Sequence, residues 1–163
     1  VNPRVQAEHT VTEMITGLDL VSLGILVSSG LDLPITQDQV SLHGHAIQAR
    51  INAENPVTLE PSPGKLWECH WPGGPGIRVD SHGFTGYDMP GAFDSLLAKI
   101  IAWAPTRDEA IAKLDSALEE TILLGVDTLI PLHRAILGEA DFIERKITTD
   151  YLVEHPDLLS RGA

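Results

Sequence analysis

The sequence predicts an α+β fold, with a mostly antiparallel sheet and helices packed on it. An apolar run at residues 96–103, interrupted only by Lys99, is typical of a central strand that is buried on both faces. Apolar residues then recur with the helical period from 106 to 123. Strand-like and helix-like segments are mixed along the chain rather than strictly alternating, which favours antiparallel pairing over parallel βαβ units.

The N-terminal third predicts one strand and two helices. Residues 1–8 alternate between polar and apolar side chains, and this period of two predicts a strand that belongs mostly to another sheet. A short helix is expected over 10–16, ending near Gly17. A second helix is expected from about Asp19, a plausible N-cap, to Ser29. Because it is apolar nearly all round, we expect it to be well buried.

The middle of the chain predicts three further strands, at 43–52, 65–71 and 77–80. A loop with three prolines, residues 56–64, separates the first of them from the second. The last two flank the Gly- and Pro-rich run 72–76, so we expect them to form a hairpin.

The C-terminal third predicts helices. Thr106 and Glu109 form the Thr-x-x-Glu pattern of a capping box, so a helix should begin there and continue until Gly125 stops it. Another helix is expected over 129–137, and a last short one near 150–154.

Composition limits the classes of function. The 163 residues suit one domain plus the tail of another. The net charge is −12, and the 11 lysines and arginines form no basic stripe, which argues against a nucleic-acid partner. No apolar stretch reaches 18 residues, so no membrane span is expected. A single cysteine, Cys69, excludes an internal disulfide, fits a reducing compartment such as the cytoplasm, and is expected to be a buried structural thiol.

Two sets of residues have the chemistry of an anion site. The polar side of residues 1–8 is either a solvated strand face or a site, since arginine offers a planar fork to an anion and glutamate can take a proton. Arg50, in an apolar strand, has either a structural ion pair or a ligand as its partner. The close pair His43 and His45 has no third ligand at zinc spacing, so a metal there is the weaker interpretation.

Five sequence blocks resemble those of biotin carboxylases. Residues 2–13 are similar to the family signature Asn-x-Arg-x-Gln-Val-Glu-His-x-Val-Thr-Glu, and 14–17 continue it. Four more similar blocks follow in family order, at 50–54, 61–64, 73–78 and 93–99. Together they span residues 2–99. The departures include Ala7 in place of the usual valine and Phe93 where tyrosine is common.

The resemblance implies a fold and a set of site residues. Residues 1–36 would be the C-terminal remnant of an ATP-grasp domain, and 37–163 the biotin carboxylase C-terminal domain. The implied catalytic residues are Glu8, the base that deprotonates bicarbonate, Arg4, which holds bicarbonate and the developing enolate charge, and Arg50, which stabilises the biotin enolate. Gln6 and the backbone of Ala7 would cradle bicarbonate and biotin, and Asn2 would lie near the second metal.

The resemblance also implies cofactors and partners. The full-length enzyme would use ATP, Mg²⁺ or Mn²⁺, and biotin on a carboxyl carrier protein or domain, and it would work with a carboxyltransferase and as a homodimer. The nucleotide and main metal ligands would lie outside this chain, so the chain alone should be inactive. The 50–54 block leans towards acyl-CoA carboxylases, which serve fatty acid metabolism. The rival interpretations are a non-catalytic packing or oligomerisation domain and another ATP-grasp ligase similar to carbamoyl phosphate synthetase.

Overall fold

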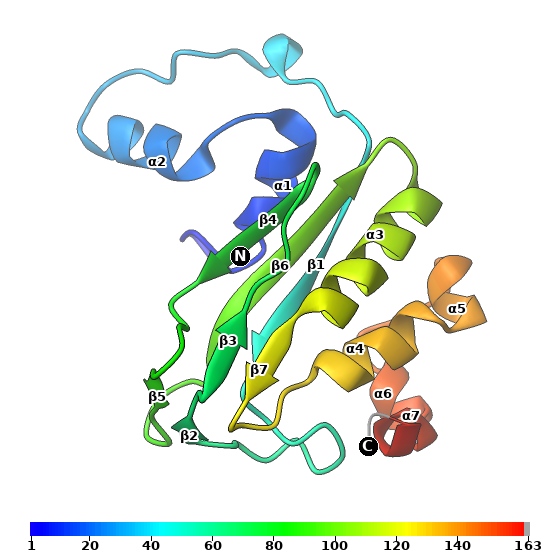
Figure 1. The fold of residues 1–163 in the computed structure, drawn as a ribbon. Helices are drawn as coiled ribbons and strands as arrows, with labels where there is room; N and C mark the ends of the chain where they lie inside the picture. The colour runs from blue at the N-terminus through cyan, green and yellow to red at the C-terminus, as the bar shows by residue number, and fades with distance from the viewer. Residues whose placement is uncertain (162–163) are drawn as a thin grey trace.

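The computed structural model describes residues 1–161 and confirms the α+β fold (Figure 1). Its main sheet has three antiparallel strands in the order β1 (His45–Asn52), β6 (Leu96–Ala104) and β4 (Ile77–Ser81). The apolar run that predicted a central strand is β6, which pairs on both edges. An apolar strand in this place buries both faces, because helices lie over each side of the sheet.

One face of the sheet packs against α3 (Arg107–Glu120). The helix begins with the predicted capping box, in which the Thr106 hydroxyl accepts from the Glu109 backbone N–H. Leu114 and Leu118 of α3 are almost completely buried against Ile100 of β6. Burying each side chain of this size stabilises the fold by roughly 1.5–3 kcal/mol, so this face is the main core.

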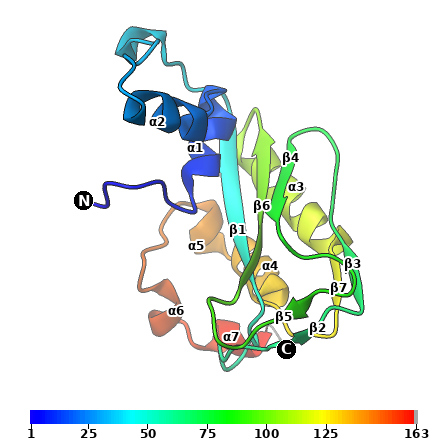
Figure 2. The ribbon, with the colours of Figure 1, turned by 90° about the vertical axis from the view of Figure 1, so that its left-hand side faces the viewer.

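The opposite face of the sheet carries several polar side chains around the buried Ile101 and lies under α1 (His9–Thr16). Side chains alternate along a strand, so the residues between those that meet α3 must point to the other side. Figure 2 shows α1 and α3 on opposite sides of the sheet. The polar side chains on this face come from all three strands: Gln48, Arg50, Lys99, Arg78 and Asp80.

Smaller elements complete the fold. Two short antiparallel ladders join β2 (Gly64–Lys65) to β5 (Asp88–Met89) and β3 (Glu68–His70) to β7 (Ile122–Leu124). Leu66, Met89 and Leu97 pack between them in a second core cluster. The remaining helices are the 3₁₀ turn η1 (Gln37–Gln39), α4 (Ile130–Leu137), α5 (Ala140–Ile143), α6 (Tyr151–Glu154) and α7 (Asp157–Arg161). Leu132, Tyr151 and Leu158 form a third cluster among α4, α6 and α7.

The strand predicted at residues 1–8 is absent. The segment is irregular as far as Gln6 and then turns directly into α1. Its backbone hydrogen bonds are local, such as Arg4 N–H to the Asn2 carbonyl at 2.8 Å, and it pairs with no strand among residues 1–161. An alternating segment forms a strand only where a neighbouring strand is available for backbone hydrogen bonds. Residues 1–8 have no such neighbour within residues 1–161, so their polar side chains do not line up on one side.

The second helix is present but not buried as predicted. α2 (Leu20–Ser28) is capped by Asp19 and has no buried residue, and Ile25 is 67% exposed. Figure 2 shows it lying away from the sheet. Within residues 1–161 no single helix is long and apolar enough to cross a bilayer, although α1 and α2, bent by 105°, meet that test of length and composition as a pair.

Two strand assignments also change. The predicted hairpin across 72–76 does not form, because β3 pairs with β7 and β4 pairs with β6. The long helix ends at Glu120 rather than near Gly125, and residues 122–124 become β7. Hairpin signals are local. The pairing of β3 with β7 joins segments about fifty residues apart, and the shared core decides it.

Candidate functional site

Glu8 and Arg50 meet over the polar face of the sheet. Arg50 Nη2 donates to Glu8 Oε2 at 2.8 Å, and both side chains are about half exposed, at 55% and 53%. Glu8 occupies the N-cap position of α1 but makes no capping hydrogen bond with its side chain, so its carboxylate projects to the sheet. Arg50 lies on β1 between Ala49 and Ile51, which point into the core, and it therefore points to the opposite side.

Two hydrogen bonds join the turn before α1 and the first turn of that helix to the sheet, and two local contacts close the turn itself. The Ala7 carbonyl accepts from Lys99 Nζ at 3.3 Å. The Gln6 carbonyl accepts from the His9 backbone N–H at 3.2 Å and lies 2.6 Å from His9 Nδ1. The hydroxyl of Thr10, which is completely buried, donates to the side-chain oxygen of Gln48 on β1. The backbone is thus tied to the sheet on each side of Glu8, at Ala7 and at Thr10.

Ion pairs continue from this turn across the sheet to α1. Lys99 contacts Asp80 at 3.2 Å, and Arg78 donates to both oxygens of Asp80 at 2.8 and 3.0 Å. Arg78 Nη1 also donates to Glu13 at 2.6 Å. The hydrogen bond from Arg78 lowers the pKa of Asp80. Burial acts to raise the pKa of Glu13, but hydrogen bonds from Arg78 and the Leu20 backbone N–H outweigh it, so this pKa is lowered too.

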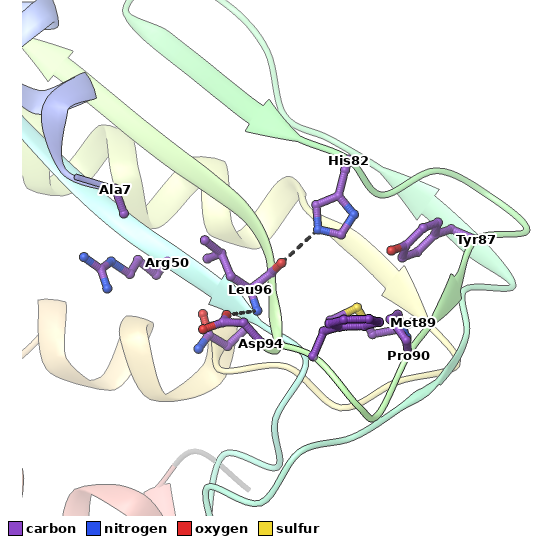
Figure 3. A pocket seen from close by; sticks show the side chains of 10 residues that line it. Ala7, Arg50, His82, Tyr87, Met89, Pro90, Asp94 and Leu96 are labelled. Carbon is purple, nitrogen blue, oxygen red and sulfur yellow. Dashed lines mark hydrogen bonds between the residues drawn. The ribbon is translucent and has the colours of Figure 1, made fainter. Parts of the chain in front are cut away.

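A cleft of about 530 Å³ opens beside the Glu8–Arg50 pair (Figure 3). Figure 3 places Ala7 and Arg50 at one end and Tyr87 at the other. Along it, Asp94 Oδ1 accepts from the backbone N–H of Leu96 at 2.8 Å. The other lining residues are Asn52, His82, Met89, Pro90 and Phe93. The cleft is therefore charged at the Arg50 end and largely apolar at the other.

Asn52 adds an unsatisfied acceptor to the cleft wall. Its Nδ2 donates to Glu54 at 2.9 Å and to Ser95 at 3.2 Å, and Ser95 in turn donates to Glu54. Since the carboxylate can only accept, these contacts fix the orientation of the amide. The opposite atom, Oδ1, is buried without a hydrogen-bond partner among the described residues. Leaving a buried acceptor without a partner costs about 1–3 kcal/mol of stability. A donor that formed a hydrogen bond with this oxygen would remove that cost.

The structure does not bring every predicted site residue to this pair. Arg4 is exposed, and among residues 1–161 its guanidinium donates only to the carbonyl of the adjacent Val5, at 3.3 Å. The expectation that Arg4 and Glu8 share one strand face therefore fails, because residues 1–8 are not a strand. Asn2 is exposed. Over residues 1–161 no group of three His, Cys, Asp or Glu side chains is placed to hold a metal, and a single amide oxygen is not a metal site.

Cys69 is partly buried, and burial raises the pKa of its thiol. A raised thiol pKa lowers the fraction of nucleophilic thiolate, which fits the structural role predicted for it.

The sequence did not indicate His133, which contacts the backbone of Arg50 from the outer edge of the sheet. β1 is an edge strand, and its outer carbonyls are met by α4 and the turn before it. His133 Nε2 lies 2.8 Å from the Arg50 carbonyl, and the Leu129 backbone N–H donates to the Asn52 carbonyl at 3.3 Å. Burial lowers the pKa of His133, and the hydrogen bond to Arg50 opposes this only in part. No local pattern marks His133, because its partner is 83 residues away.

Family comparisons agree with the fold and with the sequence blocks. Residues 48–154 match the biotin carboxylase C-terminal domain, and residues 1–36 match the ATP binding domain of the carbamoyl-phosphate synthase L chain. The biotin carboxylase of Haemophilus influenzae is 46% identical over 151 residues, which cover 93% of this chain and 34% of that protein. A pyruvate carboxylase subunit of Methanothermobacter thermautotrophicus is 45% identical over 155 residues, covering 94% and 32%.

Solved structures show the same fold. The biotin carboxylase domain dimer of Hydrogenobacter thermophilus 2-oxoglutarate carboxylase, in complex with MgADP, ADP and bicarbonate, superposes with a TM-score of 0.93. It is 43% identical, and the match covers 97% of this chain and 35% of that one. The biotin carboxylase subunit of a pyruvate carboxylase also gives a TM-score of 0.93, at 44% identity.

These matches define the class of protein by its fold, which is that of a biotin carboxylase C-terminal domain preceded by the end of an ATP binding domain. The chain belongs to the biotin carboxylase family, since the C-terminal domain of that family accounts for most of its length. The carbamoyl phosphate synthetase-like ligase, the rival considered from the sequence, is matched only over residues 1–36. The chain spans about a third of the length of the curated relatives it matches.

Proposed function

We propose that the protein containing this chain is a ligase that carboxylates biotin on a carrier, using ATP and bicarbonate. The observation that carries the proposal is the Glu8–Arg50 contact at 2.8 Å, beside an open cleft. The two residues are 42 positions apart and come from a turn and a strand. A proton acceptor and a planar cation at one half-exposed point match the needs of bicarbonate and of a developing enolate.

Each group has a separate role in the proposed reaction. Glu8 takes the proton of bicarbonate, and Arg50 stabilises negative charge on the biotin ureido oxygen. A half-exposed ion pair contributes little to stability, roughly 0–1 kcal/mol. An incoming anion can therefore take one or more N–H groups of Arg50 without a large cost, and Glu8 is then released to act as a base.

The remaining predicted site residues belong to the same proposal. Gln6 and the backbone of Ala7 line the approach to Glu8 and cradle bicarbonate and biotin. Arg4 also holds bicarbonate, which requires the first residues to move towards Glu8 when substrate binds. Asn2 contributes to a second metal whose other ligands come from the rest of the protein.

We further propose the division into residues 1–36, the end of an ATP-grasp domain, and 37–163, the C-terminal domain. The family matches at 1–36 and 48–154 support it. ATP and Mg²⁺ or Mn²⁺ would be bound by the full-length protein, in line with the MgADP and bicarbonate of the 2-oxoglutarate carboxylase structure. The isolated chain would then lack activity.

The proposed partners are a biotin carboxyl carrier protein or domain, a carboxyltransferase and a second copy of the protein. The domain dimer of the 2-oxoglutarate carboxylase supports the last of these. The single cysteine fits a reducing compartment, and we propose the cytoplasm. The lean towards an acyl-CoA acceptor stays a prediction, since the biotin carboxylases and the pyruvate carboxylase relative match this chain at nearly equal identity.

Glu8→Gln in the full-length protein tests the proposal. Glutamine keeps the shape and removes the base, so kcat for biotin carboxylation should fall by about 10²–10⁴-fold. The KM for ATP should change little. Steady-state assays with free biotin and with the biotinylated carrier measure both parameters.

Glu60→Gln is the matched control, because Glu60 is an exposed loop residue whose carboxylate contacts no described side chain. It should leave kcat unchanged. A Glu8→Gln protein that carboxylated biotin at the wild-type rate would show that Glu8 is not the base.

A further inference from the structure

Lys99 is the one charged residue in the apolar run of the central strand. It stands directly opposite Arg50 in the β1–β6 ladder, and paired residues of a ladder point to the same face. Like charges in this position destabilise a sheet. The Lys99 side chain is also only 12% exposed, so the ammonium is partly removed from water. An apolar residue would suit the strand better, which calls for a role for the charge.

The contacts of Lys99 show where the charge acts. Nζ donates to the Ala7 carbonyl at 3.3 Å and lies 3.2 Å from Asp80 Oδ2. Asp80 is fixed in turn by Arg78, which donates to both of its oxygens. Lys99 therefore links an anchored carboxylate on β4 to the peptide group immediately before Glu8.

We propose that Lys99 is a positioning residue, which holds the Ala7–Glu8 turn over Arg50 while substrate is bound. The inference rests on the proposed role of Glu8 as a base. Arg50 is the side chain that holds the Glu8 carboxylate in the structure. When an anion takes over Arg50, this contact is lost, and the Lys99 contact to the Ala7 carbonyl continues to fix the turn. A displacement of about 1 Å at a reacting group can cost about 10²-fold in rate.

Lys99→Met in the full-length protein tests this role, because methionine fills the space without a charge or a donor. We expect kcat for biotin carboxylation to fall by about 10²-fold, with little change in the KM for ATP. Lys99→Arg, which retains donors and charge, should recover part of the loss. Lys113→Met is the matched control, since Lys113 Nζ also donates to two carbonyls, of Pro75 and Trp103, at 3.0 Å each, away from Glu8. It should keep the wild-type kcat.

A double-mutant cycle separates positioning from a general structural role. If Lys99 acts through Glu8, adding Lys99→Met to Glu8→Gln should cause no further loss of kcat. Two losses that multiplied would overturn the proposal.

Hydrogen exchange gives a readout that does not depend on activity. Lys99→Met should accelerate exchange of the backbone amides of residues 8–11, and Lys113→Met should not. If the wild-type protein carboxylated no biotin, the proposed function would fail while this measurement still decided whether Lys99 holds the turn. Unchanged exchange in residues 8–11 would overturn the positioning role, whatever the activity.

Discussion

Arg50 shows how much the identity of a single side chain matters at this site. Its guanidinium offers five N–H donors in a planar fork, and among its described contacts one nitrogen is used, by Glu8. Its backbone is held from the other side by His133. The donors are thus held in place and face an open cleft, which is the arrangement that a compact oxyanion requires.

Arg50→Lys should impair carboxylation in the full-length protein although the charge is kept. Lysine loses the fork and presents a mobile point charge, so kcat should fall by about 10-fold or more. Kinetics with biotin at saturating ATP and bicarbonate measure the loss.

Arg134→Lys provides the comparison. Arg134 on α4 donates two hydrogen bonds to the carboxylate of Asp115 on α3, and it lies outside the cleft. It should leave carboxylation unchanged. Equal rates for wild type and Arg50→Lys would mean that only the charge at position 50 matters.

Among the helices, α3 has the most buried residues, and the side chains of Thr106 and Glu109 cap its start. The Thr106 hydroxyl accepts from the Glu109 N–H at 3.3 Å, and the Glu109 carboxylate accepts from the Thr106 N–H at 3.2 Å. Thr106→Ala should lower the free energy of unfolding by about 1 kcal/mol, because the Glu109 backbone N–H loses the hydroxyl that accepts from it. Urea unfolding of the protein measures this change.

Thr149→Ala is the reference substitution, since Thr149 is exposed and lies outside any helix. Its unfolding midpoint should match the wild type. If Thr106→Ala were equally neutral, the capping box would not stabilise α3.

In the molecule as a whole, the N-terminal segment is joined to the sheet chiefly by charges. The contacts run from Glu13 through Arg78 and Asp80 to Lys99 and the Ala7 carbonyl. Acid should weaken these contacts, because it protonates the carboxylates of Glu13 and Asp80. The apolar core beneath α3 has no such dependence on pH.

Stability should therefore decrease as the pH falls below the ordinary carboxyl pKa values of 4.5 for Glu13 and 3.8 for Asp80. Both pKa values are lowered in the folded state, so the unfolded chain takes up these protons first. The stabilisation is complete above the ordinary values and is lost as the pH falls through the folded ones. Urea unfolding between pH 6 and pH 3 measures this slope.

Glu13→Gln removes one of the titrating groups and should flatten the dependence. A variant with the same acid slope as the wild type would show that Glu13 takes no part in it.

The sequence determined the elements whose signals are local. The central strand follows from its apolar run, which only Lys99 interrupts, and the start of α3 follows from Thr106 and Glu109. The sequence blocks indicated the biotin carboxylase family, and the resemblance pointed to Glu8 and Arg50, which the structure places in contact. Lys99, the single charged residue within that apolar run, already stands out in the sequence.

Only the tertiary structure decided which segments meet. Alternation in residues 1–8 predicted a strand, but within residues 1–161 no strand pairs with it, and the same segment ends in a turn that sets Glu8 on Arg50. Partners for β3 and for the Arg50 carbonyl lie about 50 and 83 positions away. A pattern of neighbours carries no information on such distant contacts, because they depend on how the common core orders the chain.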